Sequence, residues 1–262
     1  MIKHAALITV VATAGLLYTA LTHETDLAKF DRNELEALIT SNRPALPIND
    51  SIEDRRQQFA RLMMDYAEHE NKRLLAARAF IPRIIERQTK HLDRDPALAL
   101  LISYFNINPK TSLDHIEAEL YLRVDVLPPA LVATQAAIES AWGRSRFAKQ
   151  GSNYFGHQCY TPGCGIKPKN NQNKSVEVRR FDTVGDSVAA YYKNINSHKA
   201  YRKLRRTRSE LRDNNKPLTA KELIPTLISY SELGKKYLGI LRSVLISDYI
   251  QLAKQMDTNA AH

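Results

Sequence analysis

The chain has 262 residues, of which 44% are hydrophobic and 25% are charged, and it contains only nine glycines. This is the balance of a globular and largely helical protein with a sizeable core, and it excludes a globally disordered chain. The formal net charge of +10 suits nucleic acid, an anionic membrane surface or an anionic polymer, so charge alone does not choose among these partners.

The first residues have the pattern of an export signal or a membrane anchor. Lys3 precedes an uncharged run over residues 5–21, and the acidic Glu24 and Asp26 follow it. The run is at the lower length limit for a membrane-spanning helix and long for the core of a signal peptide, and no clean cleavage site follows it. We therefore expect residues 1–22 to be an uncleaved anchor in the inner membrane, with the body in the periplasm. Cleavage and secretion are the alternative, and export in either form argues against a nucleic-acid partner.

The next two regions are expected to support the body of the protein. Residues 23–50 contain a short helical pattern near Glu34–Ile39 and end in NRPALPIND, which is typical of a linker. Residues 51–125 have apolar side chains at helical spacing, with a break or restart at Pro82. Two further helices are expected over Pro96–Phe105 and Leu113–Val124.

A stretch over residues 127–156 places one carboxylate in an almost uncharged helix. The pair Pro128–Pro129 suits a first helical turn, and Gly143 can end a helix, so the pattern predicts a helix over Pro129–Trp142. Glu139 lies in its last turn, where the partial negative charge of the helix end and the apolar neighbours both disfavour an ionised carboxylate. We expect Glu139 to hold its proton near neutral pH.

A protonated glutamic acid is a candidate general acid for a poor leaving group such as a glycosidic oxygen. From the pattern alone, the more common reason for such a glutamate is a structural ion pair at the edge of a cleft, here with Arg144 or Arg146.

A loop rich in glycine, aromatic and amide side chains follows over residues 152–165. Loops of this kind carry binding residues, and aromatic rings with a few polar groups suit sugar rings. The candidates are Asn153, Tyr154, Phe155 and Gln158. The alternative is a loop that packs onto its own domain.

Two cysteines lie in this loop. Cys159 and Cys164 flank a Tyr-Thr-Pro-Gly turn that can bring their α-carbons within disulfide range, and an oxidising compartment favours the bond. His157 makes a metal site the alternative, but three ligands fall short of the four that structural zinc takes. We expect a disulfide, and neither a metal nor another cofactor.

The segment that follows has strand periodicity. Val176 and Val178 alternate with charged residues over Ser175–Phe181, after a turn-like stretch, which predicts one arm of a β-hairpin with its partner near Lys167–Lys169. Asp186 is then expected to cap a helix that runs through His198.

The last third reads as helical. Residues Tyr201–Arg212 form a basic amphipathic pattern, with Leu204 and Leu211 on its inner face. Such a pattern is most often a helix whose basic side faces solvent, and binding to anionic lipid or wall polymer is the alternative. Two more helices are expected on either side of Gly234, over Thr219–Leu233 and Lys236–Met256.

Four separated blocks in matching order resemble the endo-β-N-acetylglucosaminidase (glucosaminidase-domain) family, over roughly Leu127–Met256. They read QAAIESAWGRSRFA, NYFG, CYTPGCGIKP and YSELGKKY. The chain departs from the family pattern at Ala141, where glycine is commoner, and at Tyr154, where leucine is frequent. The resemblance implies a mainly α-helical, lysozyme-like domain with a small β-hairpin over residues 126–256, preceded by the helical region and the anchor.

The resemblance also implies roles for two carboxylates. The glutamate of the family's ES-x-WG segment is the catalytic acid and falls on Glu139. Some members are thought to draw a second carboxylate from the hairpin, and the nearest match is Glu177. An exposed strand with Glu177 salt-bridged to Arg179 and Arg180 is the alternative.

The implied substrate and partner is peptidoglycan or a related N-acetylglucosamine polymer, cut at a β-linkage. An inverting reaction with Glu177 as base and attack by the substrate's own N-acetyl oxygen both stay open. A catalytically silent glycan-binding or scaffold module is the first alternative function, and a cell-wall amidase is the second. The expected substrate-binding residues are Trp142, Asn153, Phe155, Gln158, Tyr191, Tyr201 and Tyr230.

Overall fold

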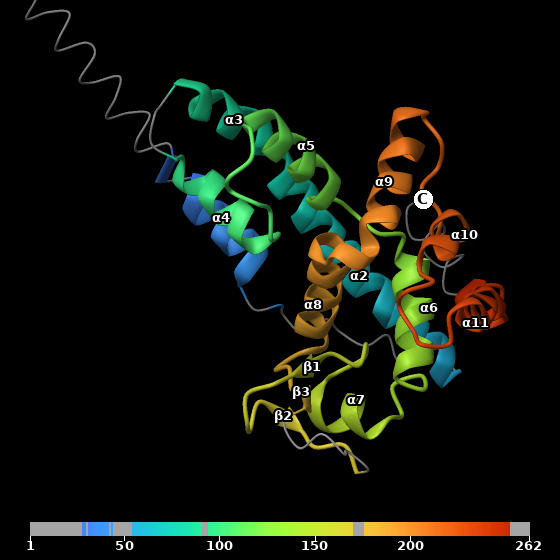
Figure 1. The fold of residues 1–262 in the computed structure, drawn as a ribbon. Helices are drawn as coiled ribbons and strands as arrows, with labels where there is room; N and C mark the ends of the chain where they lie inside the picture. The colour runs from blue at the N-terminus through green and yellow to red at the C-terminus, as the bar shows by residue number, and fades with distance from the viewer. Residues whose placement is uncertain are drawn as a thin grey trace, which may run out of the picture. The chain divides into compact units, whose positions relative to one another are not determined.

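Figure 1 shows a mainly α-helical protein with one small antiparallel sheet, as the sequence predicts. This computed structural model describes residues 28–29, 31–41, 43, 54–90, 94–169 and 176–251. None of the helices within these ranges is long and apolar enough to cross a membrane. The predicted anchor over residues 1–22 lies outside them and stays a prediction.

The chain divides into two compact units. One contains residues 76–120 and the described part of residues 1–41, and the other contains residues 121–251 and the described part of residues 42–75. Two helices, α2 (Arg55–Ala79) and α5 (Leu113–Arg123), contribute residues to both units.

The first unit is held by buried acidic residues as well as by an apolar core. Its other helices are residues 31–40, α3 (Ile81–Lys90) and α4 (Pro96–Tyr104). Pro82 lies in the first turn of α3, where a missing N–H removes no helical hydrogen bond, so the predicted restart is confirmed. The buried Asp31 carboxylate is paired with Arg83 at 2.6 Å and with Arg87 at 2.7 Å.

The second unit is built around α6 (Pro129–Glu139), whose residues 130–137 are all buried. Helices α10 and α11 pack against it. The other elements are α7 (Arg146–Gly151), α8 (Val184–Ser197), the 3-10 turn Lys199–Tyr201, α9 (Arg202–Asp213), α10 (Ala220–Leu223), the 3-10 turn Ile224–Thr226 and α11 (Lys235–Leu245).

The sheet has one strand more than the predicted hairpin. The central strand β3 (Glu177–Arg179) pairs antiparallel with both β1 (Gln158–Cys159) and β2 (Gly165–Ile166). The hairpin partner predicted near Lys167–Lys169 is β2, which ends just before Lys167. Gly165 permits this pairing, because a β-carbon there would lie 2.1 Å from the carbonyl oxygen of Val178.

Helix α6 ends three residues before the predicted end at Trp142. Ala141 and Trp142 have left-handed backbone angles, with φ of 51° and 57°, and Gly143 follows with φ of 73°. The Ser140 hydroxyl donates to the carbonyl of Ala136 and accepts the N–H of Gly143, which ties this turn to the helix end. Left-handed angles at residues other than glycine are strained, and such strain is concentrated at functional sites. Glu139 is therefore the last helical residue, immediately before a strained turn.

Three other helix predictions need correction. Helix α8 is capped by Thr183, and Asp186 is its capping-box partner in the first turn. The predicted helix over Thr219–Leu233 is only α10 and a 3-10 turn, because Pro225 cannot donate to the helical ladder. Helix α11 ends at Leu245, and residues 248–251 are helical again after a turn; the rest of the predicted helix, to Met256, lies outside the described residues.

The interpretation of the basic helix also needs correction. Arg205 and Arg208 of α9 are buried with Leu204 and Leu211, so this helix is not a simple solvated basic face. Arg208 donates to the carbonyl oxygens of Leu122 and Val126, and its guanidinium lies 3.2 Å from the Asp125 carboxylate.

Candidate active site around Glu139

The position of Glu139 follows from the local sequence. The apolar and small residues of α6 bury the helix on nearly all sides, and only its last residues reach the edge of the core. Glu139 is part-buried there, and its Oε1 accepts a hydrogen bond of 2.8 Å from the Tyr237 hydroxyl of α11. The carboxyl group is thus fixed by a helix distant in sequence.

A line of hydrogen bonds continues from this contact into the core. Gln135, one turn before Glu139 and on the same face of α6, donates from Nε2 to the Tyr237 hydroxyl oxygen at 3.1 Å. The Tyr191 hydroxyl of α8 donates to Oε1 of Gln135 at 2.5 Å. We call Tyr191, Gln135, Tyr237 and Glu139 the relay. It joins three helices through a single buried amide.

Burial raises the pKa of Glu139 above its ordinary value, and the hydrogen bond from Tyr237 opposes this by favouring the ionised form. The predicted direction of the pKa shift is confirmed. Among the described residues neither arginine of the alternative interpretation pairs with Glu139, because Arg144 bonds to the carbonyl of Ala141 and Arg146 to that of Lys167. A carboxyl group with a raised pKa and no cationic partner suits proton donation.

Aromatic rings surround the relay. Tyr230 stacks on Tyr237 with ring centres 5.6 Å apart, and Phe155 stacks on Tyr191 at 4.3 Å. Tyr201 lies 6.0 Å from Tyr230. Of the predicted substrate-binding residues, the structure therefore brings Phe155, Tyr191, Tyr201 and Tyr230 together. Tyr230 is the least buried of these rings, whereas Tyr191 is enclosed.

The other three predicted binding residues make their contacts elsewhere. Trp142 packs edge-on against Phe59 and Tyr249, with ring centres 6.0 Å and 5.5 Å away. Asn153 is buried, and its amide donates to the carbonyls of His157 and Arg179, so it holds the loop against β3. Gln158 is exposed and accepts a long bond of 3.4 Å from Tyr160. Their roles in binding stay predictions.

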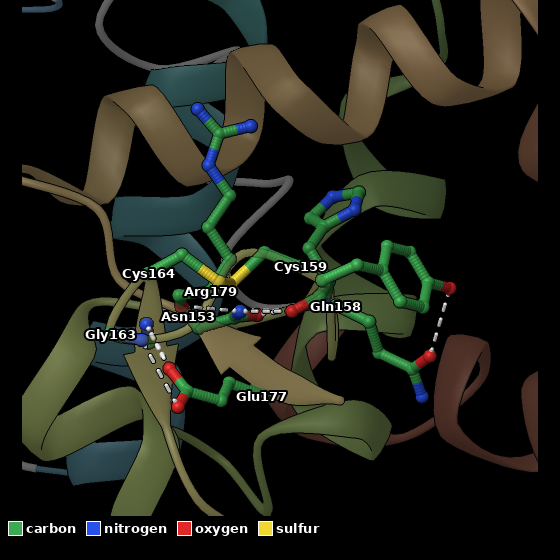
Figure 2. The surroundings of a disulfide bond; sticks show 10 residues. Asn153, Gln158, Cys159, Gly163, Cys164, Glu177 and Arg179 are labelled. Atoms are coloured by element: carbon green, nitrogen blue, oxygen red, sulfur yellow. Dashed lines mark hydrogen bonds between the residues drawn. A yellow bond between two sulfur atoms is a disulfide. The ribbon is translucent and has the colours of Figure 1, made fainter. Parts of the chain in front are cut away.

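The predicted disulfide between Cys159 and Cys164 is present, with α-carbons 6.2 Å apart. Figure 2 shows the carboxylate of Glu177 beside it, directed at the backbone of the loop that the disulfide closes. Glu177 accepts the N–H groups of Gly163 at 3.2 Å and Gly165 at 2.8 Å. These amides lower the pKa of Glu177, with smaller effects from Lys167 and Arg180.

Glu177 is only 3% exposed, so the alternative of an exposed, salt-bridged strand residue is wrong. Both of its carboxylate oxygens are occupied by loop amides. Its catalytic role stays a prediction. Its observed contacts stabilise the loop.

The zinc alternative fails on the chemistry of the donors. Cys159, Cys164 and Glu177 are the one group of three potential metal ligands in the described part of the chain, but both thiols are consumed in the disulfide. His157 lies against Phe155 and Phe181, and burial lowers its pKa to about 4. His157 is therefore a neutral packed ring at physiological pH.

Gln135 is the relay residue that the predicted site omits, and Tyr237 was expected only to close the cleft together with Tyr230, not to bond to Glu139. A signal for Gln135 was present in the sequence, since it is a long polar side chain one turn before Glu139 in an otherwise apolar helix. Tyr237 belongs to the YSELGKKY block, but the turn that separates it from Tyr230 hides the fact that their rings stack.

Two comparisons match known proteins over this site. A family model described as glucosaminidase, mannosyl-glycoprotein endo-beta-N-acetylglucosaminidase, matches residues 117–238. Protein bax of Escherichia coli (strain K12) is 31% identical over 211 residues, which cover 80% of this chain and 74% of that protein. No solved structure matches. All four relay residues fall within the span of the family model.

Proposed function

The chain belongs to the glucosaminidase family together with bacterial Protein bax, and from this premise we propose that it is a glycosidase of the endo-β-N-acetylglucosaminidase type. Its proposed substrate is β-linked N-acetylglucosamine in peptidoglycan or a related glycan. Glu139 is the general acid. The observation that carries the proposal is a carboxyl group with a raised pKa, held by Tyr237 beside a cluster of aromatic rings.

The chemistry requires one proton at the leaving oxygen. As the bond between the anomeric carbon and the glycosidic oxygen breaks, Glu139 transfers its proton to that oxygen and becomes a carboxylate. The hydrogen bond from Tyr237 strengthens as this charge develops, because bonds to ionised acceptors are stronger than bonds to neutral ones. Water then attacks the anomeric carbon, gives a proton back to the Glu139 carboxylate and leaves a new reducing end.

The nucleophile in the bond-breaking step is the substrate's own N-acetyl oxygen, which bonds to the anomeric carbon as the glycosidic oxygen leaves. Support for this comes from Glu177, whose two carboxylate oxygens are already engaged by Gly163 and Gly165. An inverting reaction would need a free carboxylate to activate water. On this proposal the protein contributes one catalytic carboxyl group, and Glu177 supports the loop.

We place the protein in the periplasm, joined to the inner membrane through residues 1–22. The Cys159–Cys164 disulfide supports an oxidising compartment, since such bonds are rare in the cytosol. Alkaline extraction of membranes is the test: retention of the full-length chain agrees with an anchor, and release of a chain without its first residues shows a cleaved signal.

Mass spectrometry of purified peptidoglycan digested with the protein tests the reaction class. A glycosidase produces new reducing ends, an amidase produces new amines, and a silent binding module leaves the polymer unchanged while still binding to it. The proposal requires the first result.

A further inference from the structure

The relay fixes more than the position of Glu139. We propose that Gln135 and Tyr191 are positioning residues that direct the hydroxyl hydrogen of Tyr237 at Oε1 of Glu139, so that the acidic proton is carried by Oε2. This inference deepens the proposed function and rests on Glu139 being the general acid. It assigns the oxygen that faces the glycosidic bond.

The Gln135 amide has one orientation that satisfies both of its neighbours. Tyr191 donates its hydroxyl hydrogen to Oε1 of Gln135, so Nε2 faces Tyr237. The Gln135 side chain is 0% exposed, as is Tyr191. An amide in such a place is costly unless its groups are paired, and here the carbonyl and one N–H each meet a hydroxyl.

The Tyr237 hydroxyl has a single hydrogen to donate. Its oxygen accepts from Gln135 at 3.1 Å, and Oε1 of Glu139 lies 2.8 Å away. A phenol has one hydrogen, and with its oxygen receiving a hydrogen from Gln135 that hydrogen is free to point at Glu139. Burial raises the pKa of Tyr237, so the phenol keeps its proton. Oε1 then accepts a hydrogen bond whether Glu139 is protonated or ionised, so the proton that titrates is on Oε2.

The two tyrosine rings of the relay are held by stacking. The ring of Tyr237 stacks on Tyr230 with only 6° between the planes, and the ring of Tyr191 stacks on Phe155. The two hydroxyl groups are therefore held by ring packing as well as by their hydrogen bonds. A fixed donor at Oε1 favours the carboxylate that proton transfer creates, and it does so without reorganisation during the reaction.

The test measures the protonation of Glu139 in the intact protein without substrate. The infrared difference between wild type and Glu139→Gln isolates the carboxyl band of Glu139, and its loss with rising pH gives the titration midpoint. The same measurement is made in the Tyr237→Phe, Gln135→Met and Tyr191→Phe backgrounds. Tyr192→Phe is the matched control, because Tyr192 is the equally buried neighbour on α8 whose hydroxyl bonds instead to Ala67 and Asn71.

The relay predicts that Tyr237→Phe raises the midpoint, because a bond to the charged form is lost. Gln135→Met and Tyr191→Phe raise it by less, since Tyr237 remains but its hydrogen is no longer directed. Tyr192→Phe leaves it unchanged. The rate of wall cleavage falls about tenfold in Gln135→Met and Tyr191→Phe. This loss is larger than that of the control Tyr192→Phe and smaller than that of Glu139→Gln.

A lowered midpoint in Tyr237→Phe would overturn the inference, because Tyr237 would then accept from the acid and the proton would lie on Oε1. Equal midpoints for Tyr191→Phe, Gln135→Met and Tyr192→Phe would also overturn it. Failure of the proposed function is a separate result: a wild type that releases no reducing ends still yields an infrared titration of the relay.

Discussion

The carboxylate of Glu177 accepts the backbone N–H of Gly165 at 2.8 Å. It also accepts the N–H of Gly163, so it binds the backbone on both sides of Cys164. Replacement by glutamine keeps one acceptor oxygen and turns an NH₂ group toward an amide donor. We therefore expect Glu177→Gln to loosen the loop between the cysteines, with faster proteolysis in that loop and a smaller loss of wall cleavage than Glu139→Gln gives. Equal losses of cleavage in a protein with an intact loop would support a two-carboxylate mechanism.

The disulfide should act on stability and leave the chemistry intact. The bond closes a short loop, with a sequence separation of 5, and chain entropy predicts a loss of about 2 kcal/mol in the free energy of unfolding for the Cys159→Ser/Cys164→Ser variant. Urea denaturation measures this loss. Thiol labelling of periplasmic wild type without reductant should modify neither cysteine, and quantitative labelling of both would contradict the pairing.

Replacing two arginines of α9 by methionine, one at a time, should lower the free energy of unfolding by very different amounts. Arg208→Met removes the buried partner of Asp125 and leaves the carbonyls of Leu122 and Val126 unpaired, so we expect a loss of about 3 kcal/mol in the free energy of unfolding. The control Arg206→Met, at an exposed position of the same helix, should stay within about 0.5 kcal/mol. Similar results for both would show that Arg208 is not a structural anchor.

The raised pKa of Glu139 predicts a pH-dependent stability. A carboxyl group whose folded pKa lies above its unfolded pKa binds more protons in the folded state, so its stabilising effect is complete below the unfolded pKa and is lost as pH rises through the folded pKa. Glu139→Gln removes this titration. The melting temperature of the variant should therefore rise relative to wild type as pH increases from below about 4.3 toward neutrality. A constant difference would mean that burial does not perturb Glu139.

Local patterns predicted the start of α6, the burial of Glu139 and the disulfide, because each depends on residues close together in the sequence. Proline fixes a first helical turn, and two cysteines around a Pro-Gly turn are already within reach of one another. The end of α6 was harder to predict. Ala141 and Trp142 are left-handed although neither residue favours that conformation, and the hydrogen bonds of Ser140 stabilise the turn.

The features that could not be predicted depend on contacts between residues far apart in the sequence. The arginines of α9 have helical spacing typical of a wetted face, yet Arg208 is buried because the backbone around Asp125 supplies its acceptors. The alternative for Glu177 was an ion pair with Arg179 and Arg180, whereas the amides of the loop have the larger effect on its pKa. Tyr237 enters the site only because α11 packs on α6, nearly a hundred residues after Glu139 in the chain.

The most direct test of the account is the rate at which wild type and Glu139→Gln release reducing ends from purified peptidoglycan. Glutamine preserves the shape of the side chain and an acceptor for Tyr237, so the variant should fold and still bind the polymer. It has no proton to give, so release should fall by about 10²-fold or more. Wild-type release by a folded Glu139→Gln variant would contradict the assignment of Glu139 as the general acid.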